Sequence, residues 1–253
     1  MTMRWAIAVL LAVSLLSVFG CEKGGSEAEG PDGDSDSDGD TDSDGDTDTD
    51  SDSDSDSDSD GDTDTEECGE ADYLGDPLAI PDGLGYPYET TLTISGFGDG
   101  ATLPSVDLFI SVCVNMEHTW IRDLQIELEA PSGEIVVLNQ FLGHTGGEVY
   151  LGVPDDTDDY DPNPGTGWTY CWTPTAVNPP MLDWANAHPF IGTLPEGDYQ
   201  ASSGFGSLLG CDLNGTWTLR CVDDWAIDNG YIFWWSMQFD QSLIPDCDDW
   251  VIE

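Results

Sequence analysis

Apolar and polar side chains alternate along much of the second half of the chain. Between residues 105 and 116 every second side chain is apolar, and polar residues fill several positions between them. The apolar set is Val106, Leu108, Ile110, Val112, Val114 and Met116. Because successive side chains of a β-strand point to opposite faces, this period of two predicts a strand with one buried face.

The same alternation continues in the next segment and predicts a hairpin. Leu124, Ile126 and Leu128 alternate with polar residues, and a Pro-Ser-Gly turn at 131–133 follows. The apolar run after that turn reads as the returning strand, so residues 123–139 are predicted to pair as a hairpin.

Two later segments each place several large side chains on one face of a strand. The first set is Trp217, Leu219 and Cys221, and the second is Phe233, Trp235, Met237 and Phe239. Asn214-Gly215 and Asn229-Gly230 are turn signals in front of these strands. A helical pattern is confined to 181–188. Many short strands separated by turns predict an all-β fold, an antiparallel β-sandwich of the jelly-roll kind.

The N-terminus has the pattern of an export signal. Arg4 precedes a fifteen-residue apolar run, Trp5–Phe19, which is too short to span a bilayer comfortably. The following "SVFGC" resembles a bacterial lipobox, which implies cleavage after residue 20 and lipid attachment to Cys21. The alternative is an ordinary secretory signal cut nearby. The lipobox reading predicts an exported lipoprotein of the bacterial envelope, anchored at the outer membrane or cell surface.

Residues 21–67 carry an extreme charge pattern. Asp occupies every second position from 32 to 64, and the whole chain has 52 acidic residues, four basic residues and a formal net charge of −48. With almost no apolar side chains, this segment is predicted to be a disordered, extended linker before a globular domain at 68–253. Its Asp-rich repeats look like the start of calcium loops, but the expected later Glu is missing. The charge excludes a basic nucleic-acid-binding surface.

The cysteine count fits an exported protein. Seven cysteines divide into the lipid-bearing Cys21 and an even set of six that we expect to form disulfides. The six are Cys68, Cys113, Cys171, Cys211, Cys221 and Cys247, and the sequence does not choose their pairing.

Four ordered blocks carry a family resemblance. They are "HTWIRDLQIELEAPSGEIVVL" (118–138), "PFIGT" (189–193), "SGFGSLLG" (203–210) and "NGTWTLRCVDDWAIDNGYIFWWSMQF" (214–239). Together they resemble the P domain, or Homo B domain, of proprotein convertases and bacterial subtilisin-like proteases, over residues 88–240. The resemblance implies a jelly roll that accompanies a protease. This chain departs from the family in placing Arg122 before Asp123, where Gly is usual.

Aspartates near predicted strand ends are candidate metal ligands. If the loops meet at one end of the sandwich, the carboxylates would suit Ca²⁺, and the resemblance adds mild support because some P domains bind calcium. The candidate ligands are Asp123, Asp223, Asp224 and Asp228. The alternative is that they cap turns by accepting backbone N–H bonds. A second, weaker candidate is the loop with Asp155, Asp156, Asp158, Asp159 and Asp161.

Catalytic signals are weak. His144, in "GHTGG", lacks a nucleophile motif or partner and is expected to lie in a turn. No block of a subtilisin-like catalytic domain is found. Trp residues in apparent loops could stack on sugars; they are Trp120, Trp168, Trp172, Trp184 and Trp225.

These observations predict a non-catalytic envelope lipoprotein that presents a P-domain-like sandwich as a binding module, with Ca²⁺ as the expected cation. Its expected partners are a membrane, reached through the lipid at Cys21, and a protein or a glycan. One alternative is an accessory partner of a separate subtilisin-like serine endopeptidase. A remote alternative is a hydrolase that uses a carboxylate pair.

Overall fold

The computed structural model describes residues 68–83, 85–155 and 163–253. The predicted signal peptide, Cys21 and the acidic linker lie outside the described residues, as do Asp156, Asp158, Asp159 and Asp161 of the second candidate loop. Within the described ranges, no helix is long and apolar enough to span a membrane.

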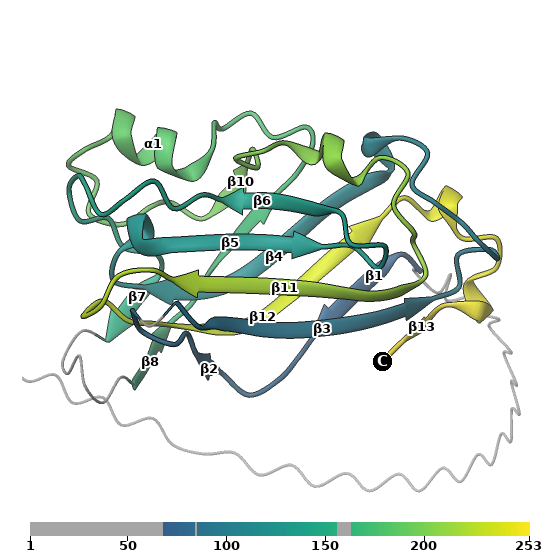
Figure 1. Cartoon of the computed structure of the whole chain (residues 1–253), viewed down its shortest axis with the longest axis horizontal. Coiled ribbons are helices and arrows are strands. Elements are labelled where there is room, and N and C mark those ends of the chain that lie inside the picture. The colour runs from purple at the N-terminus through teal and green to yellow at the C-terminus, as the bar shows by residue number, and fades with distance from the viewer. Residues whose placement is uncertain (1–67, 84, 156–162) are drawn as a thin grey trace, which may run out of the picture. The chain divides into compact units, whose positions relative to one another are not determined.

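Two sheets form the domain (Figure 1). The first has the order β1-β12-β4-β9-β10, with β2 also paired to β12. Its strands are β1 (Glu70–Tyr73), β2 (Leu78–Ala79), β4 (Phe109–His118), β9 (Trp168–Trp172), β10 (Gly197–Tyr199) and β12 (Gly230–Phe239). The pairs are antiparallel except β9 with β10.

The second sheet has the order β13-β3-β11-β5-β6 and is antiparallel throughout. Its strands are β3 (Pro87–Ser95), β5 (Leu124–Glu129), β6 (Ile135–Asn139), β11 (Gly215–Asp223) and β13 (Val251–Ile252). In Figure 1 this sheet lies in front, and β4 and β12 cross behind it at an angle. The predicted antiparallel β-sandwich is confirmed.

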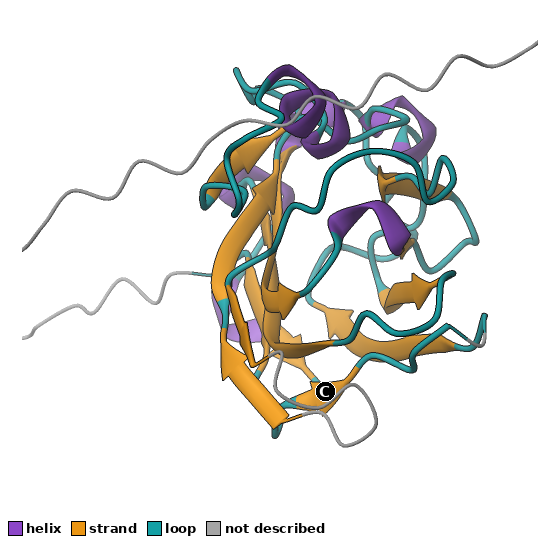
Figure 2. Ribbon diagram, turned by 90° about the vertical axis from the view of Figure 1, so that its left-hand side faces the viewer, coloured by secondary structure: helices purple, strands orange, loops and turns teal. Residues whose placement is uncertain are grey.

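The remaining elements are short and lie in the connections (Figure 2). A small hairpin pairs β7 (Val153–Asp155) with β8 (Asn163–Thr166), and the helix α1 (Met181–Ala187) lies where the sequence predicted it. Single 3₁₀ turns are η1 (Val106–Leu108), η2 (Ile121–Asp123), η3 (Phe205–Leu208), η4 (Gln241–Leu243) and η5 (Cys247–Asp249).

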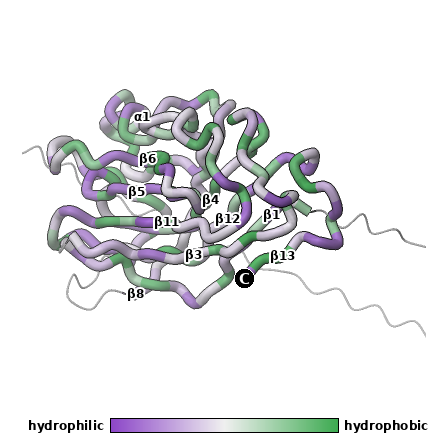
Figure 3. The backbone as a smooth tube through the Cα atoms, turned by 45° about the vertical axis from the view of Figure 1, so that its right-hand side comes forward, coloured by the Kyte–Doolittle hydropathy of each residue, from purple (hydrophilic) through white to green (hydrophobic). Residues whose placement is uncertain are grey.

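The core lies between the two sheets and follows the alternating pattern (Figure 3). Trp217, Leu219 and Cys221 of β11 are fully buried, as are Trp235 and Met237 of β12. Facing side chains from two apolar sheet faces remove a large area from water, which is the main stabilising contribution of a sandwich.

Two predicted core positions are wrong because of β-bulges. The register between β4 and β12 shifts between Ile232 and Trp234, and again between Gln238 and Phe239. An extra residue reverses which face the following side chains occupy. Phe233 therefore turns away from the core and packs over Gly167, and Ile110 is 39% exposed.

Two disulfides tie the sandwich together. Cys113–Cys171 joins directly opposite positions of β4 and β9, and Cys68–Cys247 joins the first described residue to η5. The expectation that all six cysteines pair is wrong for Cys211 and Cys221, which are buried free thiols.

Their positions explain why these two thiols do not meet. Cys221 pairs with Tyr88 near one end of β3, whereas Cys211 precedes Gly215, which pairs with Ile94 near the other end. Those ends lie about 20 Å apart along the strand, and disulfide α-carbons lie within about 7 Å. Burial raises the pKa of Cys211 to about 12 and also raises the pKa of Cys221, so both remain unreactive thiols.

A hydrogen bond across the core provides a first test of the packing. The Trp235 indole N–H donates to the Thr90 hydroxyl at 2.7 Å, between the two sheets. Thr90→Val keeps the shape but leaves a buried N–H unpaired, so the free energy of unfolding should fall by about 1–2 kcal/mol in urea denaturation. Thr91→Val, on the exposed face of the same strand, is the matched control. Equal effects of the two changes would contradict the prediction.

Candidate metal site at one end of the sandwich

Two connections between strands meet at one end of the sandwich, which is the condition that the sequence analysis set for a metal site. β4 leads through residues 119–120 into η2, which carries Asp123. β11 ends at Asp223, and the loop 224–229 crosses to β12 in the other sheet. Backbone bonds join them: the Asp224 N–H donates to the Asp123 carbonyl at 2.9 Å, and the Thr119 N–H donates to the Asn229 carbonyl at 3.0 Å.

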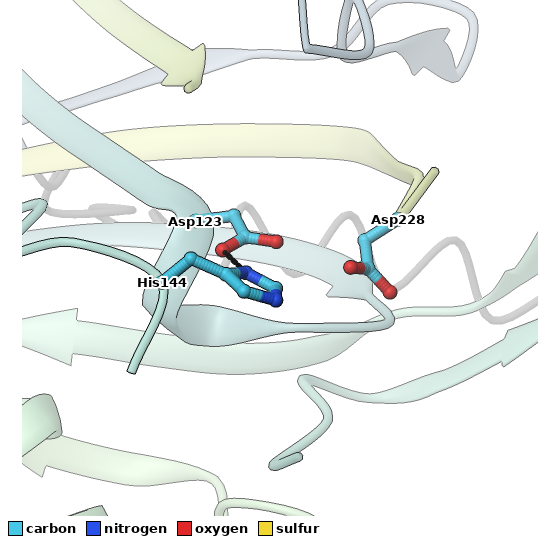
Figure 4. Close-up of side chains that lie close together, drawn as sticks. All are labelled: Asp123, His144 and Asp228. Atoms are coloured by element: carbon cyan, nitrogen blue, oxygen red, sulfur yellow. Dashed lines mark hydrogen bonds and ion pairs between the residues drawn. The ribbon is translucent and has the colours of Figure 1, made fainter. Parts of the chain in front are cut away.

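Asp123, His144 and Asp228 form the centre of this region (Figure 4). One ligand atom from each lies within 4.8 Å of the others. His144 Nδ1 lies 2.6 Å from Asp123 Oδ1, and the Thr119 hydroxyl donates to Asp228 Oδ1 at 3.2 Å. The Asp123 side chain is completely buried, and its Oδ2 has no hydrogen-bond partner within the described ranges.

His144 is held between two aromatic rings. The centroid of its imidazole lies 4.3 Å from a Trp120 ring and 4.6 Å from a Trp225 ring, and the Trp225 pair is parallel to within 8°. The side chain keeps 22% of its surface exposed. Sequence reasoning assigned His144 to a turn and did not connect it with Asp123, because the loop 140–147 reaches the site only in three dimensions.

Arg122 fixes the loop that carries His144. Its Nε donates to the Gly147 carbonyl at 2.9 Å, and its Nη1 donates to Asn186 Oδ1 of α1 at 2.8 Å. Gly146 has a φ of +133°, and a Cβ there would lie 2.6 Å from the guanidinium carbon. Arg122 stands where the resembled family usually has Gly. It joins the His144 loop to α1, and its hydrogen bonds go to Gly147 and Asn186 and not to its neighbour Asp123.

A second buried pair lies next to the cluster. His118 Nδ1 accepts the Trp120 N–H at 3.0 Å, which assigns the proton of a neutral ring to Nε2, 3.4 Å from Asp223 Oδ2. Both side chains are completely buried. Asp223 Oδ1 also accepts the Trp225 N–H at 3.0 Å. The contact between His118 and Asp223 links the two sheets, because His118 lies in β4 and Asp223 lies in β11, which belong to different sheets.

The loop 224–229 has a strained backbone beside the cluster. Ile227 has a φ of +99°, which is unfavourable for a β-branched residue. Its N–H donates to Asp82 Oδ1 at 3.1 Å. Asp82, which the sequence reading missed, therefore helps to hold the loop that presents Asp228.

The carboxylates here are crowded and poorly solvated. Burial and then the neighbouring Asp123 raise the pKa of Asp228 to about 6. Burial also raises the pKa of Asp123, against the lowering effect of His144, and burial and then Asp223 raise the pKa of Asp82. Each shift means that the charged form of the carboxyl is disfavoured by its surroundings, and a cation beside these carboxyls would favour the charged form.

The four predicted calcium ligands separate into different roles. Asp123 and Asp228 lie together, Asp223 faces His118, and Asp224 is exposed. The prediction of Ca²⁺ itself stays untested. Asp155, from the second candidate loop, lies in β7.

The aromatic candidates also separate. Trp168 and Trp172 lie in β9, and Trp184 lies in α1, so the loop assignment was wrong for these three. Trp120 and Trp225 remain at the loop end of the sandwich, and Trp225 is 48% exposed.

Residues 109–170 match the model of the proprotein convertase P-domain. No curated protein matches the chain. Among solved structures, a serine protease of Aeromonas sobria is 13% identical, with a TM-score of 0.28 over 67% of this chain and 27% of that chain.

The complex of the Aeromonas sobria serine protease with its chaperone gives similar values: 15% identity and a TM-score of 0.29, over 67% of this chain and 26% of that chain. The chain therefore spans about a quarter of the length of these protease chains. The family match includes β4, η2 and the His144 loop. The matched family is the one that the sequence blocks indicated, and the match covers residues 109–170.

Proposed function

We propose that this chain is a non-catalytic, cation-dependent interaction module of the bacterial envelope. The observation that carries the proposal is the cluster at the loop end of the sandwich, where a buried carboxylate oxygen of Asp123 has no hydrogen-bond partner among the described residues and lies in one cluster with Asp228. A cation there would offset the desolvation of two carboxylates and fix the loops that hold Trp120 and Trp225. Ligand binding would then depend on the ion.

The envelope location rests on the sequence. Export and lipid attachment at Cys21 would anchor the chain, and the acidic segment 21–67 would hold the sandwich away from the membrane. Globomycin, which blocks lipoprotein signal peptidase, tests this part: it should cause the uncleaved precursor to accumulate, and processing that the drug does not affect would contradict lipidation.

The favoured partner is a separate subtilisin-like serine endopeptidase, because the P domain is the accessory domain of such proteases and the family model matches here. A hydrolase is less well supported at this site, since Asp123 is completely buried and out of reach of a substrate. A glycan is the second kind of partner, because the exposed Trp225 ring could stack on a sugar.

Capture from envelope extracts tests the function. The full lipidated chain should retain a subtilisin-like protease when divalent cations are present, and lose it in EDTA or with Asp228→Asn. Asp212→Asn, an exposed carboxylate outside this cluster, is the matched control and should retain the protease. Capture that neither EDTA nor Asp228→Asn changes would contradict cation dependence. Glycan-array binding lost with Trp225→Ala would identify the second partner class instead.

A further inference from the structure

We propose that Asp123, His144 and Asp228 form a three-ligand site for a divalent transition-metal ion of the Zn²⁺ class, with open coordination positions toward solvent. The inference deepens the proposed function, because it names the cation class that the same end of the sandwich would bind. Each Asp would contribute one carboxylate oxygen, and His144 would contribute one ring nitrogen.

The short contact between His144 and Asp123 lies at the centre of the site. Nδ1 lies 2.6 Å from Asp123 Oδ1, so an ion bound between the two side chains would replace the proton that this hydrogen bond holds. Figure 4 shows the second oxygen of Asp123 on the side that faces Asp228.

The spacing of the three residues fits one small ion. Their ligand atoms lie within 4.8 Å of one another. An ion with bonds of about 2.0–2.2 Å holds its ligands roughly 3–4 Å apart, so a contraction of about 1 Å, within reach of small side-chain rotations, would close the site. Asp228 and His144 are partly exposed, which leaves a route for the ion to enter.

The electrostatics of the cluster favour a bound cation. Among the described residues, Asp123 Oδ1 bonds His144, Oδ2 is buried without a hydrogen-bond partner, and the neighbouring Arg122 is bound to Gly147 and Asn186. A cation beside the unpaired oxygen would offset part of the cost of burying this carboxylate. A bound divalent ion would satisfy this oxygen and remove the repulsion between Asp123 and Asp228.

The position of His144 is prepared in advance. Trp120 and Trp225 flank its ring, and Arg122 holds the loop through the Gly147 carbonyl. Ligands that are locked by packing and by supporting hydrogen bonds bind metal without paying a large ordering entropy. A surface histidine in an unsupported turn would lack these contacts.

The donor set distinguishes the metal class. Ca²⁺ takes six to eight oxygen ligands, whereas one imidazole nitrogen with two carboxylates suits Zn²⁺ and its neighbours. Asp223 is a further oxygen donor that the sequence suggested, but its Oδ1 accepts the Trp225 N–H and its Oδ2 faces His118. Three protein ligands also leave a position for water or for a ligand atom of a partner.

Calorimetric titration of the full chain with Zn²⁺, and separately with Ca²⁺, tests the site. The acidic segment 21–67 will bind either ion diffusely, so the titrations are run at about 0.5 M NaCl to screen that background. The wild type should bind one Zn²⁺ per chain with an affinity well above that for Ca²⁺. His144→Gln should lower the Zn²⁺ affinity about 100-fold or more, and Asp228→Asn should do the same.

His188→Gln is the matched control, because His188 is an exposed histidine that stacks on Trp184 and is not a member of the cluster. It should leave the Zn²⁺ affinity unchanged. Co²⁺ provides a spectroscopic readout: visible d–d bands should appear with the wild type and with His188→Gln, and disappear with His144→Gln. Far-ultraviolet circular dichroism checks that each variant is folded.

Two results would overturn the inference. Equal Zn²⁺ binding by the wild type and His144→Gln would assign the ion to the acidic segment alone. Ca²⁺ binding that exceeds Zn²⁺ binding and depends on Asp228 but not on His144 would establish an oxygen-only site, which would leave the proposed cation-dependent function intact. Conversely, tight His144-dependent Zn²⁺ binding with partner capture that EDTA does not affect would support the site and contradict the proposed function.

Discussion

Replacing Cys68 and Cys247 together by Ser should lower the free energy of unfolding by about 5 kcal/mol. The disulfide closes a loop with a sequence separation of 179 residues, from the first described residue to η5. In the chain-entropy account, opening so long a loop in the unfolded state accounts for a loss of about 5 kcal/mol. Urea denaturation of the wild type and the double variant measures it. Both thiols are removed together, so no new free thiol remains at this site.

The double variant Cys113→Ser/Cys171→Ser is the matched control. Its disulfide has a sequence separation of 58, so the same account gives about 4 kcal/mol. The difference of about 1 kcal/mol depends only on the ratio of the loop lengths. If opening the shorter loop were as costly as opening the longer one, or more so, the stabilisation would come from the folded state and the entropic explanation would be wrong.

Much of the fold could be predicted because a sandwich imposes a strict period of two on its strands. Trp217, Leu219 and Cys221 alternate without interruption, and β11 buries all three. The pattern failed at Ile110 and Phe233, where β-bulges insert a residue. A bulge depends on the partner strand as well as on the local sequence, so alternation along one strand does not reveal it.

The disulfide framework was predicted only in part for a similar reason. The even number of cysteines after Cys21 suggested three disulfides. A disulfide needs two α-carbons within about 7 Å, and that distance is a property of the fold. Cys113 and Cys171 are directly opposite on β4 and β9. Cys211 and Cys221 are close in sequence but are separated by most of the length of β11, and each fills core space as a small apolar side chain.

The candidate site was predicted where its residues follow strand ends. Asp123 and Asp228 flank predicted strands, so their meeting at one end of the sandwich follows from the sheet topology. His144 could not be found in this way, because its loop follows β6 and is placed by Arg122 through Gly147. The sequence signal for this loop was Arg122, which stands where the family usually has Gly. Its role became clear only from its hydrogen bonds to Gly147 and Asn186.

Glu117→Gln should stabilise the protein above pH 7 by about 3 kcal/mol. Glu117 lies on the outer face of β4, completely buried next to the hairpin of β7 and β8, and its carboxylate oxygens have no hydrogen-bond partner among the described residues. Burial raises its pKa from 4.5 to about 7, while nearby His118 partly opposes the rise and Asp155 adds to it. One pKa unit corresponds to about 1.4 kcal/mol.

The direction of the pH dependence follows from proton binding. A carboxyl whose pKa is higher in the folded state keeps a proton that the unfolded chain loses, so its contribution is fully present below pH 4.5 and is lost as the pH rises through about 7. Gln cannot ionise and loses nothing over this range. Urea denaturation at pH 5 and pH 8 should therefore show a small difference between wild type and Glu117→Gln at pH 5 and the full difference at pH 8.

Glu70→Gln is the control for this prediction, since Glu70 is an exposed residue of β1 in the same sheet. It should leave the pH dependence unchanged. A Glu117→Gln variant that is less stable than the wild type at pH 8 would mean that the Glu117 carboxylate is charged and compensated in the folded protein. His118 would then be the first candidate for the compensating charge, because it already opposes the rise in the Glu117 pKa. Among the described residues no Lys or Arg bonds to Glu117, and the ion pairs of Arg220 go to Glu89, Glu127 and Glu129.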